Sequence, residues 1–176
     1  MTAEVTEQVA KVLFKDYDQV AFGLFCVLAT YTIIIFTCTL PARFTTFSTN
    51  YMEDFNSMHR HETGEKRAPD FGFPDCGAGR FAKLLPYKDW YKLNCGQRCQ
   101  INFHEQLSSI LICGAITGIV YPRHTVHLLL TYCIARLLYS IGYMYSPKMR
   151  VPGAILQDVV LFYMFYLTAK CGWEIL

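Results

Sequence analysis

The chain has 176 residues, of which 53% are hydrophobic and 17% are charged, and its formal net charge is +2. This length suffices for one domain and leaves no room for a second large core. The small net charge, without a basic stripe interleaved with aromatic residues, argues against nucleic-acid binding. A charged fraction below the quarter typical of soluble domains points instead to a membrane protein.

The first 19 residues mix acidic, basic and amide side chains ahead of the first long apolar run. They lack the short apolar core and small-residue cleavage site of a secretory signal peptide. Val5, Val9, Val12 and Leu13 fall roughly on one helical face. We therefore expect a short helix lying in the membrane interface.

Four segments are long and apolar enough to cross a bilayer as helices. A span needs about 20 mostly apolar residues, because lipid offers the backbone no hydrogen-bond partners. The predicted spans are residues 20–40, 94–121, 125–147 and 151–170. We therefore expect an all-α integral membrane protein, an antiparallel four-helix bundle in which residues 1–176 form a single domain.

The connections between the spans differ in length. Residues 41–93 form a long polar loop rich in Pro, Gly and aromatic residues, whereas residues 122–124 and 146–152 are short links. Short links make neighbouring helices antiparallel. Most Lys and Arg residues fall on the side of the long loop, which predicts that this side faces the cytosol or the mitochondrial matrix.

Eight cysteines are present, and five of them lie inside or beside the spans, where they act as small hydrophobic residues. Cys76, Cys95 and Cys99 lie in or near the loop, downstream of His59 and His61. These residues include no tight CxxC pair, so we expect no metal site.

Charged side chains within the spans mark the candidate site. Arg98, Asn102 and Glu105 follow one another at intervals of four and three, so they share one face of the second span. A charge at membrane depth costs about 2.5–3.5 kcal/mol, so such groups are usually paired or face a wet cavity. We expect Glu105 to pair with Arg136. Asp158 either pairs with an arginine or lines a polar seam.

A second group of polar residues lies on the third span and at the mouth of the fourth. Arg136, Tyr139 and Tyr143 share one face, and Arg150 comes just before the fourth span. Together with Arg98, three arginines then stand against one carboxylate. This imbalance predicts an anion-binding pocket that opens toward the basic loop.

These patterns resemble the membrane-associated proteins in eicosanoid and glutathione metabolism, the MAPEG family. The second span carries R-x-Q-x-N-x-x-E as Arg98, Gln100, Asn102 and Glu105; the next carries R-x-x-Y-x-x-x-Y and a later Arg as Arg136, Tyr139, Tyr143 and Arg150. The spacing looks most like the leukotriene-C synthase and microsomal glutathione transferase branch. The resemblance covers residues 94–170 well, whereas the first span is similar only in its apolar character.

The resemblance implies a homotrimer that binds glutathione between neighbouring subunits. The implied glutathione-binding residues are Arg98, Gln100, Asn102, Glu105, Arg136, Tyr139, Tyr143 and, more loosely, Arg43. The implied catalytic residues are Arg150, which would lie by the glutathione sulfur, and Tyr143. Two features depart from the family: the long loop, and Gln106 where relatives often have an aromatic residue.

The expected function is that of a glutathione-dependent membrane transferase or peroxidase acting on a lipophilic electrophile or a lipid hydroperoxide. The expected location is the endoplasmic reticulum membrane, with the mitochondrial inner membrane as the alternative. Two other functions stay open: a non-catalytic structural subunit of a larger membrane assembly, such as a respiratory complex, and a lipid-binding protein.

Overall fold

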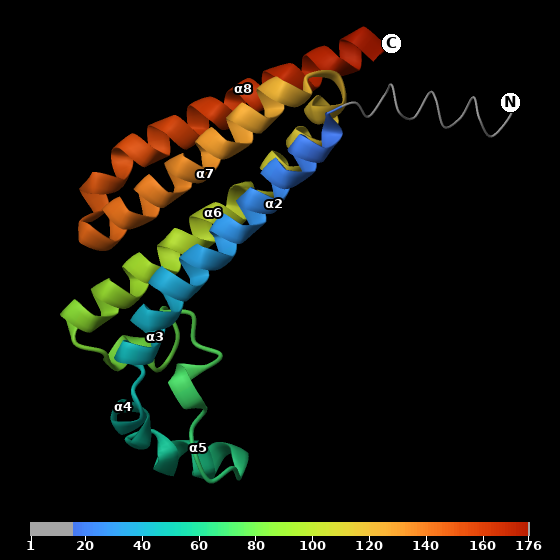
Figure 1. Ribbon diagram of the computed structural model, residues 1–176. Coiled ribbons are helices and arrows are strands. Elements are labelled where there is room, and N and C mark those ends of the chain that lie inside the picture. The colour runs from blue at the N-terminus through green and yellow to red at the C-terminus, as the bar shows by residue number, and fades with distance from the viewer. Residues whose placement is uncertain (1–15, 176) are drawn as a thin grey trace, which may run out of the picture.

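The computed structural model describes residues 16–175, and within them every regular element is helical. The expected interfacial helix of residues 1–13 lies outside this described part. The long helical stretches consist of α2 (Tyr17–Ile34), η1 (Ile35–Thr39), α3 (Leu40–Thr46), α6 (Tyr87–Val120), α7 (Pro122–Tyr145), η4 (Pro147–Arg150) and α8 (Val151–Ile175). Figure 1 shows that α2 begins and α8 ends at the same end of an up-and-down bundle.

Four helical stretches are long and apolar enough to cross a membrane, namely Tyr17–Thr46, Tyr87–Val120, Pro122–Tyr145 and Pro147–Trp173. The prediction of an all-α bundle with four membrane-spanning helices is therefore confirmed. The first and second spans are longer than expected, since the sequence pattern placed their loop-side ends at residues 40 and 94.

The first span continues past its expected end through a wider helical turn. Residues 35–39 form π-helix η1, in which the Leu40 N–H bonds to the Ile35 carbonyl. This turn directly precedes Pro41, which has no N–H and whose ring crowds the preceding turn of a regular helix. The Thr39 hydroxyl donates to the Gly96 carbonyl at 3.0 Å and so ties this turn to α6.

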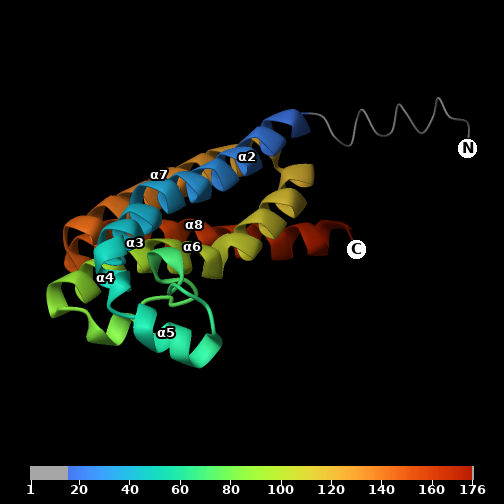
Figure 2. The ribbon, with the colours of Figure 1, turned by 90° about the horizontal axis from the view of Figure 1, so that it is seen from below.

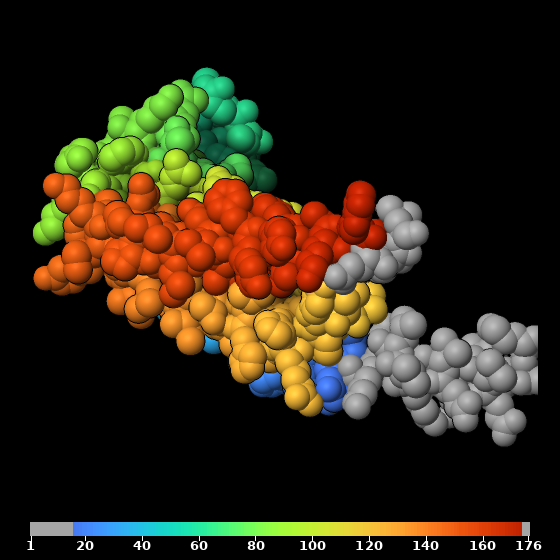
Figure 3. Space-filling model, turned by 90° about the horizontal axis from the view of Figure 1, so that it is seen from above, coloured from blue at the N-terminus to red at the C-terminus, as the bar shows by residue number. Residues whose placement is uncertain are grey.

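The core of the bundle lies between the four long helices. Its fully buried side chains include Val27, Phe103, Ile110, Leu129 and Tyr132. Glycines in α6 let the helices pack closely. At Gly118, for example, a Cβ atom would lie 2.5 Å from a Val20 methyl carbon, so any larger residue would clash with α2. Side chains on the outer surfaces, such as those of α8 in Figure 3, stay exposed as expected for a lipid-facing surface.

The long connection is a folded unit rather than an extended polar loop, and we call residues 47–86 the loop subdomain (Figures 1 and 2). It contains α4 (Thr49–Glu53), α5 (Asn56–Thr63), η2 (Asp70–Gly72) and η3 (Ala82–Leu84). Its own apolar core consists of Phe47, Met52, Phe55, Ala68 and Ala82, with Leu93 of α6. The Tyr51 hydroxyl donates to the Phe81 carbonyl at 2.7 Å, and burial, followed by the nearby Asp75 and Asp54, raises the pKa of Tyr51.

Asp75 is the polar centre of the loop subdomain and is only 7% exposed. One carboxylate oxygen accepts the N–H groups of Gly77 and Gly79, and the other accepts that of Ala82, each at 2.8 Å. A carboxylate that satisfies three backbone donors fixes the path of this segment without a regular helix.

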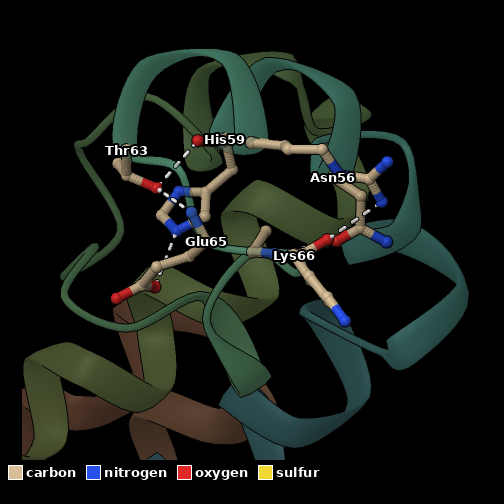
Figure 4. A network of polar contacts seen from close by, with 7 residues as sticks. Asn56, His59, Thr63, Glu65 and Lys66 are labelled. Atoms are coloured by element: carbon tan, nitrogen blue, oxygen red, sulfur yellow. Dashed lines mark hydrogen bonds and ion pairs between the residues drawn. The ribbon is translucent and has the colours of Figure 1, made fainter.

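The tip of the loop subdomain is closed by side-chain contacts around the end of α5 (Figure 4). His59 Nε2 lies 3.1 Å from Glu65 Oε2, and Thr63 donates to the His59 carbonyl at 2.8 Å. The Asn56 amide oxygen accepts the Ala68 N–H at 2.8 Å. These bonds turn the chain back toward the membrane bundle.

Candidate functional site

The α6 part of the predicted site forms one polar face. Arg98 and Glu105 are exposed and Asn102 is half-buried, and the Asn102 amide donates to Glu105 at 3.4 Å. Gln100 lies on the flank of this face, where its amide donates to the Tyr31 hydroxyl at 3.4 Å. Neither Arg98 nor Glu105 forms an ion pair within residues 16–175.

The α7 part of the site is a pair of neighbouring tyrosine rings, one of which contacts an arginine. Tyr139 and Tyr143 are buried, with their ring centroids 5.6 Å apart. The Arg150 guanidinium lies 4.9 Å from the Tyr143 ring centroid, and its side chain is exposed at the start of α8. The structure therefore joins Arg150 to Tyr143 and leaves the guanidinium accessible from outside the chain.

Arg136 is fully buried within the bundle, and the expected ion pair with Glu105 does not form in the described chain. Its Nη1 donates to the Asn102 oxygen at 2.8 Å and to the Gln157 oxygen at 2.6 Å. Its Nη2 donates to the Cys99 carbonyl at 3.4 Å. Neutral oxygens thus replace the carboxylate, because Asn102 lies one turn closer to the guanidinium than Glu105 does along α6.

Aromatic rings complete the surroundings of this buried cation. The Arg136 guanidinium lies 4.3 Å from the Phe103 ring centroid and 4.9 Å from that of Tyr139. Both distances fall in the range of cation–π attraction. Arg136 Nε and the nearby Ser140 Oγ are buried without a hydrogen-bond partner in the described chain.

Gln157 is a site residue that the sequence patterns missed. It lies on α8, is 2% exposed, and also donates to the Asn102 oxygen at 3.4 Å. The available signal was a glutamine in the middle of an apolar span, where an unpaired amide is unfavourable. Gln157 and Asn102 therefore hold Arg136 from two different helices.

Asp158 lines a polar seam, which was one of the two possibilities left open by the sequence. Its carboxylate accepts the Gln106 amide at 2.9 Å, and the Tyr132 hydroxyl donates to the Gln106 oxygen at 2.9 Å. Gln106 of α6 thus links Tyr132 of α7 to Asp158 of α8.

Arg43 lies at the base of the loop subdomain rather than on the polar face of α6. It is 3% exposed, with its guanidinium 3.8 Å from the Phe73 ring centroid and 5.5 Å from that of Phe47. Its Nε and Nη2 atoms have no hydrogen-bond partner in the described chain. Arg43 therefore connects the first span to the loop subdomain.

A single chain does not gather the three arginines around one hollow, contrary to the pocket expected from the sequence. Arg136 is enclosed in the bundle, whereas Arg98 and Arg150 are exposed on α6 and at the start of α8. The chain thus presents two outward-facing polar groups, joined through the interior by Asn102 and the Arg136 network.

Comparison with known proteins gives a family but no close relative. No curated protein and no solved structure matches the chain. The family model that matches is that of the MAPEG family, over residues 21–170. This match covers the loop subdomain and almost the full length of the four membrane-spanning helices, a wider range than the two motifs alone. With most of its length matched, the chain is an integral membrane protein that belongs to the MAPEG family.

Proposed function

We propose that the protein is a glutathione-dependent membrane transferase or peroxidase that binds glutathione between the subunits of a homotrimer. The observation that carries the proposal is the exposure of Arg98 and Glu105 on a membrane-spanning helix without a counter-ion in the described chain. Unpaired charges on such a helix call for a partner, because lipid does not solvate them. A charged ligand held against a second subunit supplies that partner.

The charges of glutathione match those of the α6 face. Glutathione carries two carboxylates and one ammonium, so Arg98 pairs with a carboxylate and Glu105 with the ammonium. Gln100 and Asn102 add neutral hydrogen bonds to the peptide. Arg136 acts through Asn102, since its own guanidinium is buried.

Arg150 and the tyrosine pair of a neighbouring subunit complete the proposed site. A free thiol has a pKa of about 8.5, so only a few per cent is thiolate at neutral pH. A guanidinium beside the sulfur favours the thiolate by charge attraction. Arg150 fills this role, with its guanidinium oriented by the Tyr143 ring, whose centroid lies 4.9 Å away; Tyr139 packs against Tyr143.

Two reactions follow from one stabilised thiolate. In conjugation, the sulfur forms a bond to the electrophilic carbon of a lipid, and the displaced or ring-opened oxygen takes up a proton. In peroxide reduction, the sulfur attacks the outer hydroperoxide oxygen, which releases the lipid alcohol and glutathione sulfenic acid. A second glutathione then converts the sulfenic acid to the disulfide and water.

Substitution of the two exposed arginines tests the proposal. In purified protein, Arg150→Ala should lower turnover about a hundredfold, the effect of removing one preorganised charge-stabilising donor, with little change in glutathione affinity. Arg98→Ala should chiefly weaken glutathione binding. Lys148→Ala, which removes an exposed cation of the same η4 turn, is the matched control. Equal turnover in wild type and Arg150→Ala would show that Arg150 does not stabilise the thiolate.

The assembly state after mild detergent extraction separates the proposal from its rivals. A homotrimer that retains glutathione supports the enzyme. A single copy held among other subunits indicates a structural role, and a protein that retains lipid but neither binds nor turns over glutathione indicates a lipid carrier.

A further inference from the structure

A basic and aromatic surface lies at the start of α6, next to the loop subdomain. Tyr87, Trp90 and Tyr91 are 74%, 37% and 40% exposed, respectively. The exposed Lys88 and Lys92 lie one turn apart among them. We call these five residues the α6 collar. Large exposed apolar side chains beside unpaired cations are unusual on a surface that faces only water.

Helix lengths place the α6 collar at the level of the lipid headgroups. α6 has 34 residues and is about 51 Å long at 1.5 Å per residue, far longer than a hydrocarbon core of about 30 Å. α7 has 24 residues, or about 36 Å, which nearly matches the core. The last turn of α7 lines the same cleft as Lys92 and Cys95, so the membrane boundary crosses α6 at the collar.

A cleft of about 370 Å³ separates the start of α6 from the end of α7. The cleft is lined by two cations and one acid, Lys88, Lys92 and Asp89. Its other lining residues are mainly apolar or aromatic and include Tyr91, Met144, Tyr145 and the buried Tyr143. Within the described chain, no carboxylate oxygen lies within 4 Å of either lysine ammonium. With Asp89 included, the cleft keeps one net positive charge.

We propose that this cleft binds the headgroup of an anionic phospholipid from the leaflet on the loop side. The phosphate takes the place between the ammonium groups of Lys88 and Lys92, which lack a protein anion. The glycerol and upper acyl chains lie against Tyr91, Met144 and Tyr145, amphipathic or apolar groups suited to the interface. The net positive charge selects an anionic lipid over a zwitterionic one.

Native mass spectrometry of the full-length protein tests the proposal. Protein exchanged into detergent with equal amounts of phosphatidylglycerol and phosphatidylcholine should retain phosphatidylglycerol about tenfold in preference, the effect of one to two lysines at the headgroup level. Lys88→Gln with Lys92→Gln should reduce this ratio to about one. Lys66→Gln with Arg67→Gln removes the same charge from exposed positions of the loop subdomain and should leave the ratio unchanged.

Three results would overturn the proposal. Equal retention of both lipids by the wild type would show that the cleft does not select charge, and an unchanged ratio in the Lys88 and Lys92 variant would place the selection elsewhere. Loss of the bound lipid on addition of glutathione would assign the cleft to the thiol-peptide site, since Tyr143 borders both. Turnover with glutathione is read separately, so failure of the lipid proposal leaves the proposed function standing.

Discussion

Gln157→Leu tests whether the buried Arg136 network organises the polar face of α6, where we propose that glutathione binds. The substitution removes the shortest hydrogen bond of the guanidinium, 2.6 Å from Nη1 to the Gln157 oxygen, and keeps a side chain of similar volume. A hydrogen bond to a charged group contributes about 1.5–3 kcal/mol. For a chain of this size, each kcal/mol shifts the Tm by about 2–4 °C, so we expect a decrease of about 3–12 °C.

The same variant should weaken glutathione binding without lowering kcat in proportion. Gln157 lies behind Asn102, and its loss frees Asn102 to rotate away from the position in which it donates to Glu105. Thermal unfolding in detergent, followed by circular dichroism, gives the Tm. Isothermal titration with glutathione and steady-state kinetics give the Kd, KM and kcat.

Gln157→Glu is the matched control for Gln157→Leu. It keeps an oxygen acceptor at the same place and adds a charge that compensates Arg136, so the Tm should equal or exceed that of the wild type. The reasoning fails if the Leu variant keeps the wild-type Tm, or if the Glu variant is as unstable as the Leu variant. An unchanged glutathione Kd in a destabilised Leu variant would confine Gln157 to a purely structural role.

Two further substitutions test the loop subdomain and the helix packing. Asp75→Ala leaves three backbone N–H groups without their acceptor, which costs about 1–3 kcal/mol for each buried donor. Limited proteolysis should then cut the loop subdomain while the membrane helices stay intact. Resistance to proteolysis equal to that of the wild type would contradict this. Gly153→Ala places a methyl group against the backbone of Tyr139, so overpacking of about 1–3 kcal/mol should lower the Tm and the glutathione affinity together. A Gly153→Ala protein with wild-type Tm would show that α7 and α8 separate without penalty.

The membrane bundle could be predicted because its cause is local in the sequence. Long uncharged runs such as residues 20–40 admit few structures in lipid other than a helix, and short links fix the order of neighbouring helices. The end of the first span was placed too early, at residue 40, because the long apolar run ends there and the polar segment begins at Pro41. In the structure the helix continues through the π turn at residues 35–39, where Thr39 makes a tertiary hydrogen bond to Gly96 that the sequence does not reveal.

The partners of the buried charge could not be predicted from spacing alone. The periodicity of α6 correctly put Asn102 and Glu105 on one face, but it does not say which of them reaches Arg136. The choice depends on how far α6 and α7 are shifted along their axes, and Gln157 of α8 enters only through the tertiary arrangement of the three helices. The loop subdomain was missed for a similar reason, since aromatic residues such as Phe55 bury one another only after the chain has folded back.

The π turn at residues 35–39 also sets the rotational register of everything that follows it on the first span. A π turn amounts to one extra residue in an α-helix, and each residue rotates the helix by about 100°. Without that extra residue, the Arg43 guanidinium would swing away from the Phe73 ring that it now faces. One extra residue in the first span thus determines the direction in which Arg43 meets the loop subdomain.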